Sequence, residues 1–210
     1  MICIIDLGYG NITSIKKMLN KLGYEAIISN KSEDIKRSLK LILPGVGSYD
    51  SAMNNLIKLD LIDLLNHEVL VNKKQILGIC LGMQIMFDKS EEGDLPGLGW
   101  IKGDVIKFES DSKKQKVKYP NIGWRDIEVK QGNLFARRQV ERFYFVHNFY
   151  CKPFFEKDIF MTSQYGHEFC AAVVKENIIG VQFHPEKSHH FGMSFFTKYL
   201  DYESHTSFID

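Results

Sequence analysis

Short apolar runs recur along the first 80 residues and are separated by segments of mixed polarity. The runs lie at residues 2–6, 24–28, 40–43 and 75–79. Each has the length and composition of a strand buried inside a sheet. Between residues 12 and 22 the apolar positions instead repeat at helical spacing, and Gly23 ends the repeat.

Two further segments of the first half predict helices. Residues 32–39 form the first, with Ser32 as the expected N-cap, and residues 50–66 form the second. Strands that alternate with helices are typical of a parallel sheet covered on both faces. We therefore expect a flavodoxin-like α/β fold, with an open, mostly parallel sheet and helices on both faces.

The pattern changes after residue 104 to shorter segments rich in β-forming residues. Strands are expected at residues 105–108, 126–129, 142–147, 160–164, 169–175 and 178–183. Glu176-Asn177 is a plausible hairpin turn between the last two, and the polar run 109–118 predicts a loop. A closing helix is expected at residues 189–202. No internal repeat or linker interrupts the chain, so a single domain over residues 1–210 is predicted.

Composition narrows the possible functions. The chain has 210 residues, 44% of them hydrophobic, and a net charge of +1, with lysines spread along its length. Such a chain can bury a full core but gives no electrostatic case for binding nucleic acid or an anionic membrane. No signal peptide and no apolar run long enough to span a bilayer is visible, so a cytoplasmic location is expected.

No cofactor or metal site is expected. Gly8-Tyr9-Gly10 lacks the full dinucleotide-binding spacing, and His189-His190 with His184 lack a fourth ligand at a recognisable distance in sequence. The cysteines show no C-x-x-C pairing, and a reducing compartment disfavours disulfides. We expect three of them to be packing residues: Cys3, Cys151 and Cys170.

The fourth cysteine lies in a distinctive context. The apolar strand at residues 75–79 runs into Gly78-x-Cys80-x-Gly82 and then into an expected helix, which is the pattern of a nucleophile elbow with sulfur in place of oxygen. A side chain at either glycine would collide with neighbouring backbone in so tight a turn. The N–H groups of a helix that begins at Leu81 would favour the thiolate of Cys80. The alternative is a buried core cysteine.

A second segment supplies a base and an acid. His184 and Glu186 are two residues apart, and such positions point to the same side in extended chain. A thiol, a base and an acid that orients the base form a nucleophilic triad. The loop at residues 43–48 offers the Val46-Gly47 peptide as an oxyanion donor beside the Leu81 N–H, although a plain loop is equally open.

These motifs together resemble the class I, or triad-type, glutamine amidotransferases, over nearly the whole chain from Ile2 to about Tyr202. More narrowly, several short motifs resemble the glutaminase subunits of imidazole glycerol phosphate synthases. They are Tyr9-Gly10-Asn11, Ser90-Glu91-Glu92, Gly97-Leu98-Gly99-Trp100, Tyr144-Phe145-Val146-His147 and Tyr165-Gly166.

The resemblance implies a mechanism. Cys80 would attack the side-chain amide of L-glutamine to form a thioester, His184 would pass the proton to departing ammonia, and Glu186 would orient the imidazole. It also implies a set of residues that hold the amino-acid end of the substrate: Gln84, Glu92 and the backbone around Asn148 and Phe149. His147 is expected to be structural.

The same resemblance implies a partner. Glutaminase subunits of this kind form a heterodimer with a (β/α)8-barrel cyclase, which uses the ammonia to make imidazole glycerol phosphate and AICAR in L-histidine synthesis. Lys187 with Tyr144 and Trp124 would form the gate at the ammonia exit. Where the family usually reads Pro-His-Met-Gly-Trp-Asn, this chain has Asn121 and Arg125 at the two polar positions, in a region expected to face the partner.

That departure leaves other functions open. The nearest is a paralogous glutaminase that feeds another synthase, such as one that amidates surface sugars. A cysteine peptidase or deglycase of a related elbow fold commonly has His directly after the nucleophile, whereas Leu81 stands here. A non-enzymatic interaction or regulatory module is the alternative of another class, and an intact Cys80, His184 and Glu186 argue against it.

Overall fold

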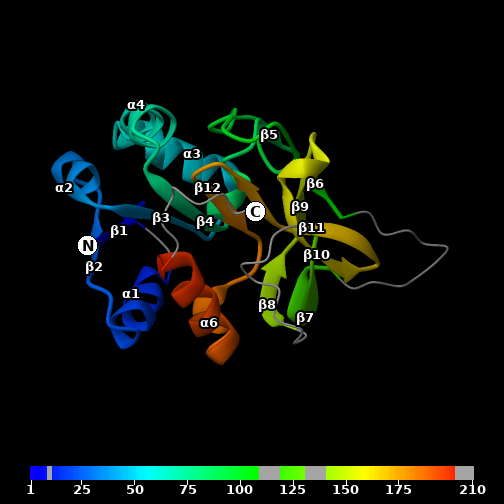
Figure 1. Ribbon diagram of the computed structural model, residues 1–210. Coiled ribbons are helices and arrows are strands. Elements are labelled where there is room, and N and C mark those ends of the chain that lie inside the picture. The colour runs from blue at the N-terminus through cyan, green and yellow to red at the C-terminus, as the bar shows by residue number, and fades with distance from the viewer. Residues whose placement is uncertain (9–10, 109–118, 131–140, 202–210) are drawn as a thin grey trace.

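The parallel half of the main sheet is built by the first strands of the chain. The computed structural model describes residues 1–8, 11–108, 119–130 and 141–201 (Figure 1). Five neighbouring strands run parallel, in the order β2 (Ala26–Ser29), β1 (Ile2–Ile5), β3 (Lys40–Gly45), β4 (Gln75–Cys80) and β12 (Ile178–Val181). This is the strand order of flavodoxin-like sheets. The predicted fold class is confirmed.

The second half of the chain extends the same sheet with antiparallel strands. After β12 come β11 (His167–Lys175), β10 (Ile159–Tyr165), β7 (Asn121–Val129) and β8 (Arg142–His147). Lys175 pairs with Ile178 across the predicted Glu176-Asn177 turn, so this hairpin is confirmed. The sheet as a whole is therefore mixed, with its parallel strands on one side.

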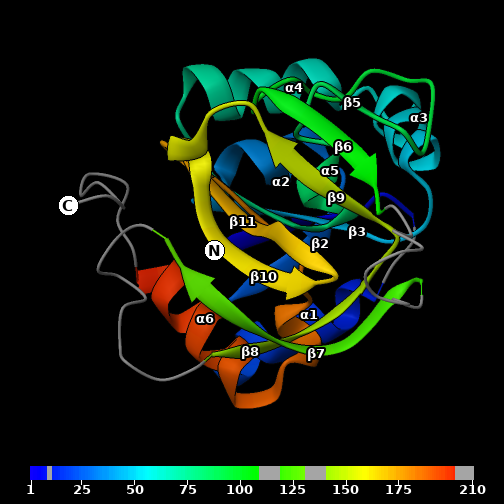
Figure 2. The same ribbon diagram turned by 90° about the vertical axis from the view of Figure 1, so that its right-hand side faces the viewer.

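A second, three-stranded sheet lies beside the first (Figure 2). Its strands are β5 (Lys89–Ser90), β6 (Gly103–Lys107) and β9 (Phe149–Pro153), and a 3-10 turn at Glu156–Asp158 leads from β9 to β10. Neither β5 nor β9 is predicted above. β5 has only two residues, and the apolar start of β9 is only three residues long before Lys152 and Pro153, so neither has the length of a recognisable strand pattern.

Helices cover both faces of the main sheet, as predicted (Figures 1 and 2). The first face carries α1 (Ile12–Lys21) and α6 (His189–Asp201), whose buried side chains belong to one core cluster. The other face carries α2 (Ser32–Arg37), α3 (Tyr49–Lys58) and α4 (Ile62–Asn66), which contribute to a second cluster. The polar run 109–118 and residue 202 lie outside the described residues.

Two helix predictions are wrong in detail. Ser32 is the first residue of α2 and Lys31 is its N-cap. No side chain caps α2, although Ser29 Oγ accepts the N–H of Lys31 at 3.1 Å and donates to Asp34 in the first turn at 2.6 Å.

The expected helix over residues 50–66 is two helices. The chain adopts a left-handed conformation at Asp60, with φ of 55°, which ends α3 before α4 begins. A π-helical turn, His67–Val71, then follows α4.

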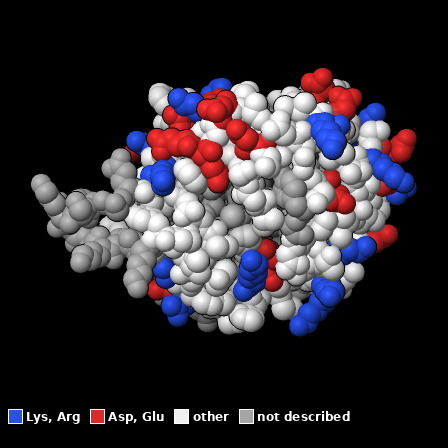
Figure 3. Space-filling model, turned by 180° about the vertical axis from the view of Figure 1, so that it is seen from behind, with Lys and Arg blue, Asp and Glu red and all other residues white. Residues whose placement is uncertain are grey.

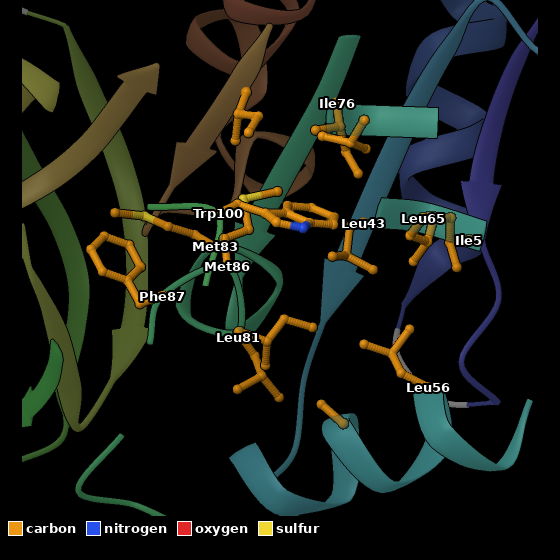
Figure 4. Close-up of a cluster of buried hydrophobic side chains, with 14 of the residues drawn as sticks. Ile5, Leu43, Leu56, Leu65, Ile76, Leu81, Met83, Met86, Phe87 and Trp100 are labelled. Atoms are coloured by element: carbon orange, nitrogen blue, oxygen red, sulfur yellow. The ribbon is translucent and has the colours of Figure 1, made fainter. Parts of the chain in front are cut away.

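The helix after β4 anchors the sheet to the core. α5 (Leu81–Gln84) is buried throughout, and Figure 4 shows Leu81 and Met83 among the apolar side chains of the second cluster. The three other cysteines are buried and free, in keeping with packing roles, and burial raises the pKa of the Cys3 thiol to about 11. Within the described ranges, no helix has the length and apolarity needed to cross a membrane.

Charged residues are dispersed over the face seen in Figure 3. Lysine and arginine lie in small separate groups, and aspartate and glutamate gather mainly in one region at its upper left. This distribution agrees with a net charge of +1 spread along the chain.

Candidate active site

Cys80 stands at the sharp turn between β4 and α5. Its φ of 54° and ψ of −112° are strained for a residue with a side chain, as expected of a nucleophile elbow. A Cβ on Gly82 would lie 1.8 Å from the Leu43 carbonyl oxygen, and one on Gly78 would lie 2.7 Å from the oxygen of Gly82. The predicted need for glycine at both positions is confirmed. Gly45 on β3 is a third such position, with Gly82 N at 2.4 Å.

His184 and Glu186 form a buried pair just beyond β12. Pro185 starts a 3-10 turn, Pro185–Lys187, and His184 Nδ1 lies 2.7 Å from Glu186 Oε1. Burial alone lowers the pKa of His184, but the negative charges of a Cys80 thiolate and of Glu186 outweigh it and raise the pKa to about 10. His184 Nε2 has no hydrogen-bond partner among the described residues, which leaves it available for chemistry.

Cys80 and His184 line one cavity of about 270 Å³. This volume is close to the lower end of the ~300–1,000 Å³ of small-molecule sites, so the cavity suits a ligand of amino-acid size. Its wall contains most of the candidate residues together with three that were not predicted there: Val46, Gly47, Cys80, Leu81, Gln84, Glu92, Asn148, Phe149, His184 and Lys187, with Pro120, Val146 and His147. The cavity lies beyond the carboxyl ends of β3, β4 and β12, where open α/β sheets place their sites.

The candidate oxyanion donors lie on two sides of the cavity. Leu81 follows Cys80 at the start of α5, and the Val46-Gly47 peptide follows β3. Gly47 has φ of 98°, which strains any residue with a side chain, and an added Cβ would meet no atom within 4 Å. The loop is thus constrained by backbone conformation and has open space around it.

The two candidate substrate-binding side chains are held by backbone groups. Glu92 Oε2 accepts the N–H of Tyr49, the first residue of α3, at 3.0 Å, and burial raises the pKa of the Glu92 carboxyl. Gln84 Nε2 donates to the Phe149 carbonyl at 3.1 Å and to Gln182 Oε1 at 3.0 Å. The amide nitrogen of Gln84 is therefore committed to the protein.

His147 and Asn121 are paired inside the molecule. His147 Nδ1 lies 2.7 Å from the Phe149 carbonyl and Nε2 lies 2.9 Å from Asn121 Nδ2. Burial lowers the pKa of His147 to about 4, so the ring is neutral and donates from Nδ1. Asn121 is fully buried, so its own side chain faces no partner, and the expectation that the surrounding region does so stays a prediction.

The expected gate residues form an aromatic cluster next to the cavity. Lys187 Nζ lies 5.9 Å from the centre of the Tyr144 ring, and the Tyr144 and Trp124 ring centres are 6.3 Å apart. His189 stacks on Trp124 at 5.6 Å. Of the three predicted gate residues, Lys187 lines the cavity and the two aromatic residues do not.

The second changed polar position is also partly enclosed. The Arg125 guanidinium lies 4.7 Å from the centre of the Tyr165 ring and donates to the Trp124 carbonyl at 2.9 Å. The apolar Ile122 on the same strand is 51% exposed.

Two further observations concern groups around the sulfur. Gln182 Nε2 donates to Cys80 Sγ at 3.6 Å and is a residue that the motif analysis missed. The spacing of two residues that links His184 to Glu186 also links Gln182 to His184, and could have found it. In the described ranges, no three histidine, cysteine, aspartate or glutamate side chains are grouped to hold a metal ion.

Comparison with known proteins agrees with this geometry. The profile of the family described as Glutamine amidotransferase class-I matches residues 3–199. Among curated proteins, the chain is 49% identical to "Imidazole glycerol phosphate synthase subunit HisH 2" of Methanococcus maripaludis, over 95% of this chain and 98% of that protein. It is 43% identical to the protein of the same name from Pseudomonas aeruginosa, over 96% and 99%.

A solved structure titled "Crystal structure of glutamine amidotransferase" superposes with a TM-score of 0.74 at 19% identity. The superposition covers 95% of this chain and 97% of that one, and at this identity it supports the fold alone.

Proposed function

The chain belongs to the class-I glutamine amidotransferase family, and from that membership we propose that it is the cytoplasmic glutaminase subunit of an imidazole glycerol phosphate synthase. In this role it hydrolyses L-glutamine to L-glutamate and ammonia and delivers the ammonia to a (β/α)8-barrel cyclase. Two relatives that it matches over more than nine-tenths of their length are named as subunits of that synthase.

The observation that carries the proposal is the cavity shared by Cys80 and His184, whose imidazole is paired with Glu186. The Cys80 thiolate attacks the side-chain carbonyl carbon of glutamine, and the carbonyl electrons move onto oxygen. When the tetrahedral intermediate collapses, the C–N bond breaks and the nitrogen leaves with a proton from His184 Nε2. Because an amide nitrogen is a poor leaving group, this proton transfer is required, and such transfers contribute on the order of 10²- to 10⁴-fold.

The second half of the cycle uses the same groups. His184, now neutral, takes a proton from water, and the water oxygen attacks the thioester. The C–S bond breaks and glutamate leaves. Glu186 fixes the imidazole through Nδ1, so that Nε2 is the nitrogen that exchanges the proton. The N–H groups of Leu81 and Gly47 would hold the oxyanion in both tetrahedral intermediates.

The amino-acid end of glutamine would lie near Glu92. Its ionised carboxylate is the group in the cavity wall suited to pair with the substrate α-ammonium, and the Tyr49 N–H holds it in place. The backbone at Asn148 and Phe149 supplies peptide groups on the opposite wall. The Phe149 carbonyl already accepts two hydrogen bonds, so the part of Phe149 left for the substrate is its N–H.

Ammonia leaves toward the cluster of Lys187, Tyr144 and Trp124. Ammonia that escaped into neutral water would be protonated and lost as a nucleophile, so a partner that covers the exit belongs to the proposal. The half-buried Trp124 and the exposed Ile122 on β7 provide apolar contact area beside Lys187.

A second candidate is the same glutaminase serving another ammonia-using synthase. It is favoured by Arg125, which stands where the wider family usually has asparagine and whose guanidinium lies against the Tyr165 ring.

One experiment separates these possibilities. Glutamine hydrolysis is measured with the purified chain alone and with the barrel cyclase of the same genome plus its ribonucleotide ligand, and Cys80→Ala is the control. Stimulation by the cyclase that disappears in Cys80→Ala supports the proposal. Turnover without stimulation moves the partner away from histidine synthesis, and co-purification then identifies it. A non-enzymatic module would be favoured if no combination turned over glutamine and Cys80→Ser left function in cells unaffected. A peptidase or deglycase would be favoured if the chain turned over peptides or glyoxal adducts.

A further inference from the structure

A fully buried amide lies against the sulfur of Cys80 and has no part in the proposed mechanism. Gln182 is 0% exposed, and its Nε2 donates to Cys80 Sγ at 3.6 Å. On another side of the sulfur, the Val146 carbonyl oxygen lies 3.9 Å away. Besides its interaction with His184, the sulfur therefore has one amide donor and one carbonyl acceptor within reach.

The direction of the Gln182 amide follows from its neighbours. The Phe149 carbonyl can only accept, so the atom of Gln84 that faces it at 3.1 Å is the amide nitrogen. The same nitrogen lies 3.0 Å from Gln182, so the atom of Gln182 that faces it is the oxygen. Gln182 then has only its N–H group to offer to the sulfur. The orientation of a side chain next to the nucleophile is thus set by a backbone carbonyl on β9.

We propose that Gln182 is a hydrogen-bond donor to the Cys80 thiolate and that Gln84 is the positioning residue that keeps this donor turned toward the sulfur. The inference rests on the proposed function in one respect, which is that Cys80 is the nucleophile.

The chemistry favours the charged form of the sulfur. A thiol can give its proton to the Val146 carbonyl, but a thiolate has no proton to give and is repelled by that oxygen. The Gln182 N–H is attracted to both forms and more strongly to the thiolate, because hydrogen bonds to charged acceptors are about twice as strong as those to neutral ones. The donor therefore stabilises the thiolate before attack and again when the thioester breaks.

The chain contains a matched control for a purely structural role. Gln75 lies on β4, the strand that ends in Cys80, and is only 4% exposed. Both polar atoms of its side chain have no hydrogen-bond partner among the described residues. Replacing Gln75 by methionine changes a buried glutamine of the same strand without touching the sulfur.

The test uses the full chain in three variants, Gln182→Met, Gln84→Met and Gln75→Met. The rate at which iodoacetamide alkylates Cys80 is followed between pH 5 and 10 by mass spectrometry of the Cys80 peptide. Glutamine turnover is measured in parallel with the partner present, and thermal unfolding reports on folding.

We expect Gln182→Met to move the pH of half-maximal alkylation upward by about one unit and to lower kcat about tenfold, with KM within about twofold of the parent. Gln84→Met raises the pH of half-maximal alkylation by a smaller amount, because Gln182 is still present but its amide is free to turn. Gln75→Met follows the parent profile.

A parent-like alkylation profile in Gln182→Met would overturn the inference, and so would an equal shift in Gln75→Met. If Gln182→Met does not fold, a parent-like profile in Gln84→Met overturns it instead. Alkylation needs no glutamine, so the inference is decided even if the parent chain turns over no substrate. Absence of turnover in the parent would count against the proposed function alone.

Discussion

Glu186 Oε1 and His184 Nδ1 are 2.7 Å apart, and the two side chains are 4% and 3% exposed. A charge pair so fully removed from water interacts more strongly than a surface pair. Glu186 holds the imidazole in one orientation and also helps to keep its proton. Both effects serve the proposed proton transfer. A substitution that removes the charge of Glu186 but keeps an acceptor for Nδ1 can separate them.

Glu186→Gln keeps an acceptor for Nδ1 and removes the charge. Burial lowers the pKa of His184 and Glu186 helps to raise it, so the pKa of His184 should be lower in the variant than in the parent. We expect kcat to fall by about tenfold to a hundredfold and the alkaline limb of kcat/KM to move downward. Glutamine turnover across pH measures both. The exposed Glu25→Gln is the control, and an unmoved alkaline limb would contradict the charge role.

Glu92→Gln tests the proposed contact with the substrate ammonium. The variant removes the charge of a half-buried carboxylate, and its main effect should be on binding. We expect KM for glutamine to rise about tenfold or more, with a smaller change in kcat. In the parent, burial raises the pKa of Glu92, so KM should also rise as the pH falls through this raised value. A pH-dependent KM that persists in Glu92→Gln would assign the effect to another group.

Gly82→Ala tests the close approach of α5 to β3. The new methyl group would overlap the Leu43 carbonyl oxygen, which belongs to the backbone and cannot move aside cheaply. We expect a loss of about 3 kcal/mol or more in the free energy of unfolding, or failure to fold. Gly23→Ala is the matched control, because φ there is 87° with no atom within 4 Å of the new Cβ. It should cost about 1 kcal/mol through backbone strain alone. Because Gly82 lies within α5 and has no positive φ, equal losses in urea unfolding would show that the overlap at Gly82 is relieved by small backbone shifts.

His147→Gln tests the neutral buried imidazole. The pKa of His147 is lowered to about 4 in the folded protein from an ordinary value of 6.5, so the unfolded chain binds an extra proton between these pH values. The free energy of unfolding should therefore fall as the pH drops from 6.5 to 4, by up to about 3 kcal/mol from this residue. Subtracting the variant's denaturation profile from the parent's isolates this contribution. The exposed His190→Gln is the control. A difference in unfolding free energy that stays constant with pH would show that His147 takes up its proton in the folded protein as readily as in the unfolded chain.

Local sequence was enough to predict the site's main chemical groups. The elbow at Cys80 follows from two glycines at fixed spacing around one cysteine, and the His184–Glu186 pair follows from a spacing of two residues. Both depend on the local geometry of a few consecutive residues, which the motif itself specifies. The first strands and α1 follow similarly from apolar periodicity. The break at Asp60 and the short strands β5 and β9 do not follow from apolar periodicity. Their conformations depend on packing and pairing with distant segments.

The sequence by itself determined the flavodoxin-like order of strands and helices and the identity of the candidate nucleophile, base and acid. Only the tertiary structure decided which side chains meet across the fold. It buries Asn121 against His147 and lines up Phe149, Gln84 and Gln182 behind the sulfur of Cys80. The physical reason is that alternation along a strand tells which face a side chain takes, whereas its hydrogen-bond partner comes from another strand whose register only the folded sheet sets.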